Sequence, residues 1–169
     1  MKIVASFLLP YYFDRVDSYF RDFKLRELEM SDTIEGGCLC GNIRFQTTEK
    51  PSYQLLCYCT DCQTISGAAN FAAYGVPIEA ISVIKGEPKI FEVTADSGRI
   101  NSRRFCPDCG SRIWAQIDEL GLASVNAFAL DNRSHFKPLS NHCPESAPAW
   151  CEINETLEFF PRIPREPIS

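Results

Sequence analysis

The pattern of hydrophobic and polar positions changes near residue 33. Before that point, between residues 11 and 30, apolar side chains recur every three or four positions with charged residues between them: Phe13, Val16, Phe20 and Phe23. This periodicity predicts an amphipathic helix within an N-terminal extension, residues 1–33. We expect its aromatic stripe to pack on the body of the domain or on a second subunit, which would make the chain a homodimer.

After Gly36 and Gly37 the pattern is that of short β-strands. Apolar and polar residues alternate at 43–46. Further segments rich in aromatic or β-branched residues follow: 52–58, 69–76, 81–84, 89–93, 99–105, 112–117 and 122–130. The chain is therefore predicted to be mainly β, with about seven strands. The residues from Lys85 to Pro88 predict a hairpin turn between two of these strands.

The rest of the chain is predicted to form one domain followed by a short tail. Residues 34–161 are long enough for one domain with a substantial core, in which we expect Trp114 and Trp150 to be buried. The last eleven residues, FFPRIPREPIS, contain three prolines, and we expect their end, residues 162–169, to form an extended tail.

Composition narrows the classes of partner. The chain is 45% hydrophobic and 23% charged, as in ordinary globular proteins, and its net charge of -5 disfavours nucleic acid and acidic membranes as partners. The sequence contains no run of about 18 apolar residues, so it predicts no membrane-spanning helix. The start, MKIVASFLLP, lacks a small-residue cleavage site. Nine cysteines, mostly closely paired, favour bound metal in a reducing cytoplasm over a disulfide framework.

Seven of the nine cysteines fall into three groups: Cys38 and Cys40; Cys57, Cys59 and Cys62; Cys106 and Cys109. A structural zinc site takes four ligands, whereas a catalytic one takes three and keeps a position open. The C-x-x-C spacing lets a tight turn bring both sulfurs to one metal, and glycines around the C-x-C pair permit a similar bend. These two pairs together would make a closed Cys₄ site.

The group CYCTDC could supply three ligands from one short loop, and several interpretations of it remain open. A second structural zinc could be completed by His142, Cys143 or Cys151, although the two cysteines are more typical of packing thiols. Cys59 and Cys62 could instead form a redox disulfide. If the site is open, three thiolates leave zinc with a net charge of -1, which suits binding an incoming thiol better than making hydroxide.

Four segments, taken in order, resemble the glutathione-dependent formaldehyde-activating enzyme family, which is related to centromere protein V: GGCLCGNIRF, CYCTDCQTISG, SGRINSRRFCPDCGSRIWA and APAWCEI. The resemblance spans about residues 34 to 160. It implies an Mss4-like fold of short sheets stabilised by zinc, with two zinc ions per chain. The implied structural ligands are Cys38, Cys40, Cys106 and Cys109, and the implied catalytic ligands are Cys57, Cys59 and Cys62.

The resemblance also implies an activity. In this family the second zinc takes the sulfur of glutathione, which adds to formaldehyde to give S-hydroxymethylglutathione, so the chain would be a carbon–sulfur lyase. Two residues depart from the family pattern: Tyr58 stands where His is common and Gln63 where Arg is common. Without that basic residue a peptide carboxylate loses a partner. The expected substrates are therefore glutathione or another small thiol, with formaldehyde or a small aldehyde.

The substrate pocket should offer cations and closely approachable backbone. Arg103 and Arg104 are the first candidates, and strand alternation predicts that they point to opposite faces. Arg99 and Arg133 are weaker ones. Ser66 and Gly67 follow the metal loop and could let a ligand approach the backbone, while the hydroxyl of Tyr58 or Ser66 could move a proton.

A second function competes with catalysis. The chain could be a non-catalytic zinc module that binds a small thiol or a protein partner, with the helix at residues 11–30 as its interaction surface. A zinc ribbon that binds nucleic acid is disfavoured, because the sequence is acidic and has no basic stripe.

Overall fold

The computed structural model describes residues 33–48, 50–95 and 97–161, and these residues are mainly β, as predicted. The strands are β1 Thr33–Gly37, β2 Arg44–Thr48, β3 Tyr53–Cys57, β4 Phe71–Pro77, β5 Ser82–Lys85, β6 Lys89–Thr94, β7 Ile100–Phe105, β8 Arg112–Ile117, β9 Leu122–Asn126, β10 Ser140–His142 and β11 Glu158–Phe160. The α-helix is α2 Thr60–Ser66, and the 3-10 helices are η1 Ile78–Ala80, η2 Asp118–Leu120, η3 Ala127–Ala129, η4 Arg133–His135 and η5 Pro144–Ser146. The helix expected at residues 11–30 and the tail at 162–169 lie outside the described residues.

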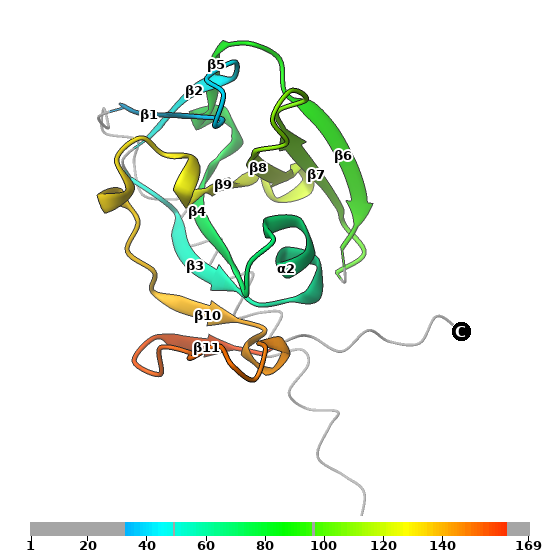
Figure 1. The fold of residues 1–169 in the computed structure, drawn as a ribbon, viewed down its shortest axis with the longest axis vertical. Coiled ribbons are helices and arrows are strands. Elements are labelled where there is room, and N and C mark those ends of the chain that lie inside the picture. The colour runs from blue at the N-terminus through cyan, green and yellow to red at the C-terminus, as the bar shows by residue number, and fades with distance from the viewer. Residues whose placement is uncertain (1–32, 49, 96, 162–169) are drawn as a thin grey trace, which may run out of the picture. The chain divides into compact units, whose positions relative to one another are not determined.

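The strands form two sheets (Figure 1). The smaller sheet has the order β1-β2-β5, and the larger has the order β11-β10-β3-β4-β9-β8-β7-β6. Pairing is antiparallel except that β10 lies parallel to both β3 and β11. Helix α2 follows β3 directly, so the residues that link them lie at the end of a central strand.

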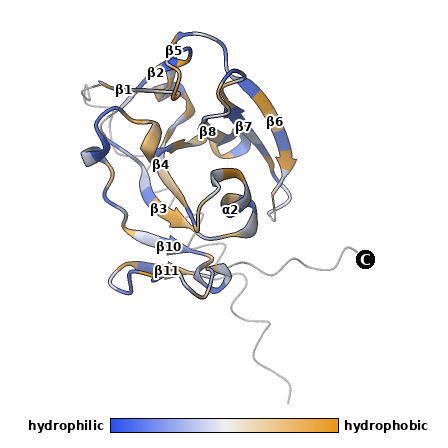
Figure 2. Cartoon of the chain, in the orientation of Figure 1, coloured by the Kyte–Doolittle hydropathy of each residue, from blue (hydrophilic) through white to orange (hydrophobic). Residues whose placement is uncertain are grey.

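The core lies between the central strands of the larger sheet and the smaller sheet. Six of the seven residues of β4 are buried, which is typical of a strand covered on both faces. Phe45 of the smaller sheet packs against Trp114 of β8 with ring centroids 6.1 Å apart. Burying side chains of this size contributes about 1.5–3 kcal/mol each. In contrast, the edge strand β6 carries exposed apolar side chains (Figure 2).

Several expectations about the chain's path were wrong. The residues from Lys85 to Pro88 do not close a hairpin, because β5 pairs with β2 and β6 pairs with β7, so this segment crosses between the sheets. Strands β1, β10 and β11 and helix α2 were not predicted. Strands β10 and β11 have three residues each, too few for a periodic pattern to be read.

The two tryptophans have different environments. Trp114 is buried, as expected, but Trp150 is 77% exposed, so its predicted core position is wrong. Trp150 follows η5 in a segment without strand pairing, where nothing in the larger sheet covers it.

Candidate metal centres

Two turns that are distant in the sequence supply the first cysteine group. The turn after β1 is closed by the Cys38 N–H, which donates to the Ile43 carbonyl at 3.1 Å. The turn after β7 is closed by the Gly110 N–H, which donates to the Cys106 carbonyl at 2.9 Å. Gly110 has a φ of 71°, a left-handed conformation that glycine adopts without strain.

These turns bring four sulfur atoms together: those of Cys38, Cys40, Cys106 and Cys109, all within 4.8 Å of one another. The Cys38 and Cys40 sulfurs are 3.4 Å apart, and those of Cys40 and Cys106 are 3.7 Å apart. Tetrahedral zinc with bonds near 2.3 Å holds its sulfur ligands about 3.8 Å apart. The ligand type, number and spacing therefore fit a closed tetrahedral zinc site.

Hydrogen bonds contribute to opposite pKa shifts at two cysteines of this group. The Ser111 hydroxyl lies 3.2 Å from the Cys109 sulfur and, with the Ser111 backbone, lowers the pKa of Cys109 to about 5. At Cys40 the hydrogen bond from the Asn42 backbone lowers the pKa, but the hydrogen bond to Cys38 and desolvation outweigh it and raise the pKa to about 12. Four thiolates at this spacing repel one another, so a cation is needed to hold them all ionised.

The second group is centred on the junction of β3 and α2. Cys57 is the last residue of β3, Cys59 is the N-cap of α2 and Cys62 lies in its first turn. The three sulfurs lie within 4.8 Å of one another, and the Cys59 sulfur accepts a hydrogen bond from the Cys62 N–H at 3.4 Å. Cys62 thus belongs to a helix rather than to the expected loop. Three convergent thiol groups fit a zinc ion with an additional ligand.

Of the candidates for a fourth protein ligand, Cys143 contacts Cys57, but neither it nor His142 or Cys151 shares the mutual spacing of the three sulfurs. Among the described residues, only Cys57, Cys59 and Cys62 share the mutual 4.8 Å spacing. Cys143 forms a hydrogen bond with Cys57, which, with Cys59, Cys62 and burial, raises the pKa of Cys57. His142 stacks on Phe160, with ring centroids 4.7 Å apart, and burial lowers its pKa to about 4.

The two arginines predicted from β7 do lie on opposite faces. The buried Arg103 donates to the Asp61 carboxylate of α2 at 2.9 Å, and this ion pair joins the cysteine-bearing helix to β7. Arg104 instead lies over the Trp114 ring, 5.3 Å from its centroid. Arg103 therefore has a carboxylate partner from the chain itself.

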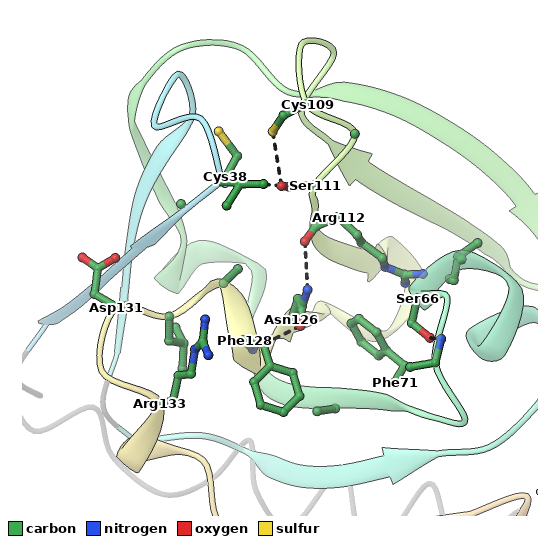
Figure 3. A pocket seen from close by; sticks show the side chains of 18 of the residues that line it. Cys38, Ser66, Phe71, Cys109, Ser111, Arg112, Asn126, Phe128, Asp131 and Arg133 are labelled. Carbon is green, nitrogen blue, oxygen red and sulfur yellow. Dashed lines mark hydrogen bonds between the residues drawn. The ribbon is translucent and has the colours of Figure 1, made fainter.

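A cavity of about 710 Å³ adjoins the first cysteine group and reaches the last residues of helix α2 (Figure 3). Its wall includes Cys38 and Cys109 of the first group and, on the side of the second group, Ser66 and Arg112. Arg133 also lines it, whereas Gly67, Arg103 and Arg104 do not. The structure thus brings two of the candidate substrate residues, Ser66 and Arg133, to one cavity.

Arg112 is the residue of this cavity that sequence reasoning missed. Its guanidinium lies over the Phe71 ring, 4.3 Å from the centroid, and it interacts electrostatically with Cys62, Cys57 and Cys59. Burial lowers the pKa of Arg112 to about 10, which leaves it cationic at neutral pH. Its place after the C-x-x-C-G-S motif was visible in the sequence, but nothing there placed β8 beside α2.

Three other residues of the CYCTDCQTISG segment are buried or hydrogen-bonded within the chain. The Gln63 side-chain amide donates to the carbonyls of Tyr58 (2.6 Å) and Ser146 (2.8 Å), so it holds the backbone rather than facing the cavity. Burial raises the pKa of Tyr58, which is 1% exposed. The Ser66 hydroxyl donates to the Asn70 carbonyl at 3.1 Å.

A mainly β fold with two clustered cysteine groups defines a class of protein that could hold two metal ions. The profile of the glutathione-dependent formaldehyde-activating enzymes matches residues 33–145, and the chain belongs to this family. A Halomonas elongata protein, whose name provisionally assigns it to these enzymes, is 28% identical over 145 residues, covering 80% of this chain and 92% of its own. A crystal structure of a Rhodobacter sphaeroides protein matches with a TM-score of 0.48 at 18% identity, over 59% of this chain and 89% of that one.

Among the described residues, no helix is long and apolar enough to cross a membrane.

Proposed function

We propose that the chain is a zinc-dependent carbon–sulfur lyase of the S-(hydroxymethyl)glutathione synthase type, with an Mss4-like fold. It holds a structural zinc on Cys38, Cys40, Cys106 and Cys109 and a catalytic zinc on Cys57, Cys59 and Cys62. The observation that carries the proposal is the three-sulfur group, which no fourth side chain joins at the same spacing within the described residues. Membership of the family supports glutathione as the thiol and formaldehyde as the aldehyde.

The chain's own residues would prepare the substrate thiol. When bound, zinc supplies an open coordination position that lowers the pKa of a thiol. Cys57, Cys59 and Cys62 hold that position at the end of β3, and the ion pair of Arg103 with Asp61 fixes α2. The Arg112 cation offsets the negative charge of the thiolates.

The reaction forms one carbon–sulfur bond. The glutathione thiol releases its proton to water. The resulting thiolate sulfur donates an electron pair to the carbonyl carbon of formaldehyde, and the carbonyl π electrons move to the oxygen. That oxygen takes a proton from water or from the hydroxyl of Ser66, which lines the cavity. The product is S-hydroxymethylglutathione, and atoms and charge balance without an oxidant or a reductant.

The test compares Cys57→Ser with Cys151→Ser, since Cys151 belongs to neither cysteine group. Exchange spectroscopy by NMR would measure the rate at which glutathione and formaldehyde interconvert with the adduct, and elemental analysis would measure zinc. Cys151→Ser should keep two zinc ions and the rate enhancement, whereas Cys57→Ser should lose one zinc ion and the enhancement. Full enhancement in Cys57→Ser would overturn the proposal.

A further inference from the structure

The Arg112 guanidinium has buried nitrogens without partners. Its Nε and Nη1 atoms are buried and form no hydrogen bond within the part of the chain that the structure describes. A buried donor of a charged group that lacks an acceptor is strongly unfavourable, so natural proteins rarely keep one without a reason. The Phe71 ring provides a favourable face for the cation but accepts no conventional hydrogen bond from its edge.

Arg112 lies between the cavity and the second cysteine group. It lines the cavity, and it interacts electrostatically with all three cysteines of that group. Figure 3 shows its side chain extending from β8 toward α2, above the Phe71 ring. A molecule in the cavity that places a sulfur near these cysteines would therefore pass the guanidinium.

No carboxylate among the residues that line the cavity pairs with Arg112. Asp131 is the acidic residue among those lining the cavity, and it pairs with Arg44, which also pairs with Glu35. Arg103, the neighbouring guanidinium, pairs with Asp61. Each of these two cations has an acidic partner, whereas the charged groups of opposite sign near Arg112 are the cysteines of the second group, and none of the described residues accepts a hydrogen bond from its Nε or Nη1.

We propose that Arg112 determines substrate specificity: its guanidinium binds a carboxylate of the thiol substrate in the cavity, and this selects anionic thiols over neutral ones. The inference rests on the proposed function and adds the residue that recognises the substrate's charge. A guanidinium is suited to this role because its planar donors match the two oxygens of a carboxylate.

The test uses ligands that lack a free thiol, so that it does not depend on catalysis. S-methylglutathione carries both carboxylates, and its diethyl ester carries neither. Isothermal titration of each into the full-length, zinc-replete protein gives a ratio of dissociation constants, ester to acid. We expect a ratio of about 10 to 100 in the wild type, the range for a charge-assisted hydrogen bond.

The decisive variant is Arg112→Met, which keeps a long unbranched side chain beside Phe71 but removes the guanidinium. It should bring the ratio close to one, and Arg112→Lys should give an intermediate ratio because it keeps the charge without the planar fork. Arg104→Met is the matched control, since Arg104 also stacks on a ring but does not line the cavity, and it should keep the wild-type ratio.

Two results would overturn the inference: an unchanged ratio in Arg112→Met, or no binding of S-methylglutathione to the wild type. An unchanged ratio would mean that Arg112 only balances the charge of the cysteine group. Failure of the proposed function gives a different result, because the adduct exchange rate would not be enhanced while the binding ratio still depended on Arg112.

Discussion

Replacing Gln63 by glutamate tests how the second cysteine group is held. The Gln63 amide donates both of its hydrogens to backbone carbonyls, those of Tyr58 and Ser146. Gln63→Glu keeps the shape of the side chain but removes both donors. Because Tyr58 lies between Cys57 and Cys59 in the sequence, the change loosens the backbone that carries these two cysteines.

The size of the effect follows from the two hydrogen bonds that glutamate cannot form. Each such bond contributes about 0.5–1.5 kcal/mol, and an ionised carboxylate against two carbonyl oxygens adds about 1–3 kcal/mol. We therefore expect the free energy of unfolding to fall by about 2–6 kcal/mol at pH 8. For a chain of this size that lowers Tm by roughly 4–24 °C.

The introduced carboxyl also makes the loss of stability in Gln63→Glu depend on pH. Only its protonated form can donate to a carbonyl, so folding raises its pKa above the unfolded value of about 4.3. The added destabilisation is absent below that value and grows as the pH rises through the folded pKa. Gln63→Ala, which removes the donors without adding a charge, should show no such dependence.

Thermal unfolding followed by circular dichroism at pH 5.5 and pH 8 would measure these differences, with wild type and both variants at each pH. Gln63→Glu should be less stable than Gln63→Ala at pH 8, and the gap should narrow at pH 5.5. Equal Tm values for the two variants at pH 8 would refute the assignment of the amide hydrogens to these carbonyls.

Three further changes test other parts of the structure. His142 has a pKa lowered to about 4 by burial, so the free energy of unfolding should fall by about 3 kcal/mol as the pH falls from about 6.5 to 4. His142→Phe should flatten this acid limb of the pH–stability curve, and an unchanged acid limb would contradict the assignment. Gly86 has a φ of 73°, and an added Cβ would lie 2.1 Å from the Asn42 carbonyl oxygen, whereas Gly98 has a φ of 79° and open space around the Cβ position. In urea unfolding, Gly86→Ala should therefore lower the free energy of unfolding by about 2–4 kcal/mol and Gly98→Ala by only about 1 kcal/mol. Equal losses of stability would contradict the close contact at Gly86. Cys106→Ser should release one zinc ion and lower Tm by about 10 °C or more, because the first group ties two distant turns together, while an unchanged Tm would mean that this group is not structural.

The grouping of the cysteines could be predicted because its signal is local. The spacing of Cys106 and Cys109 in a turn needs no knowledge of the rest of the fold, and the same holds for Cys57, Cys59 and Cys62. Alternation along β7 was also enough to send Arg103 and Arg104 to opposite faces.

The surroundings of these groups could not be predicted, because they depend on tertiary contacts. Arg112 lies near the second group only through the tertiary arrangement of the chain, and no local pattern distinguishes it from Arg104. Strand β10 is recognisable only through its parallel pairing with β3, a strand more than eighty residues earlier. The same applies to Gln63, whose second acceptor, Ser146, lies 83 positions away.

The most direct test of the account is whether the second cysteine group accepts a thiol as its fourth ligand. Cobalt(II) substituted for zinc in the full-length protein reports its ligands through visible absorption, and glutathione would be added stepwise to wild type and to Cys57→Ser. The account predicts a spectral change in the wild type that saturates at one thiol per chain and is absent in Cys57→Ser. A wild-type spectrum that already shows two complete four-sulfur sites and does not respond to glutathione would contradict it.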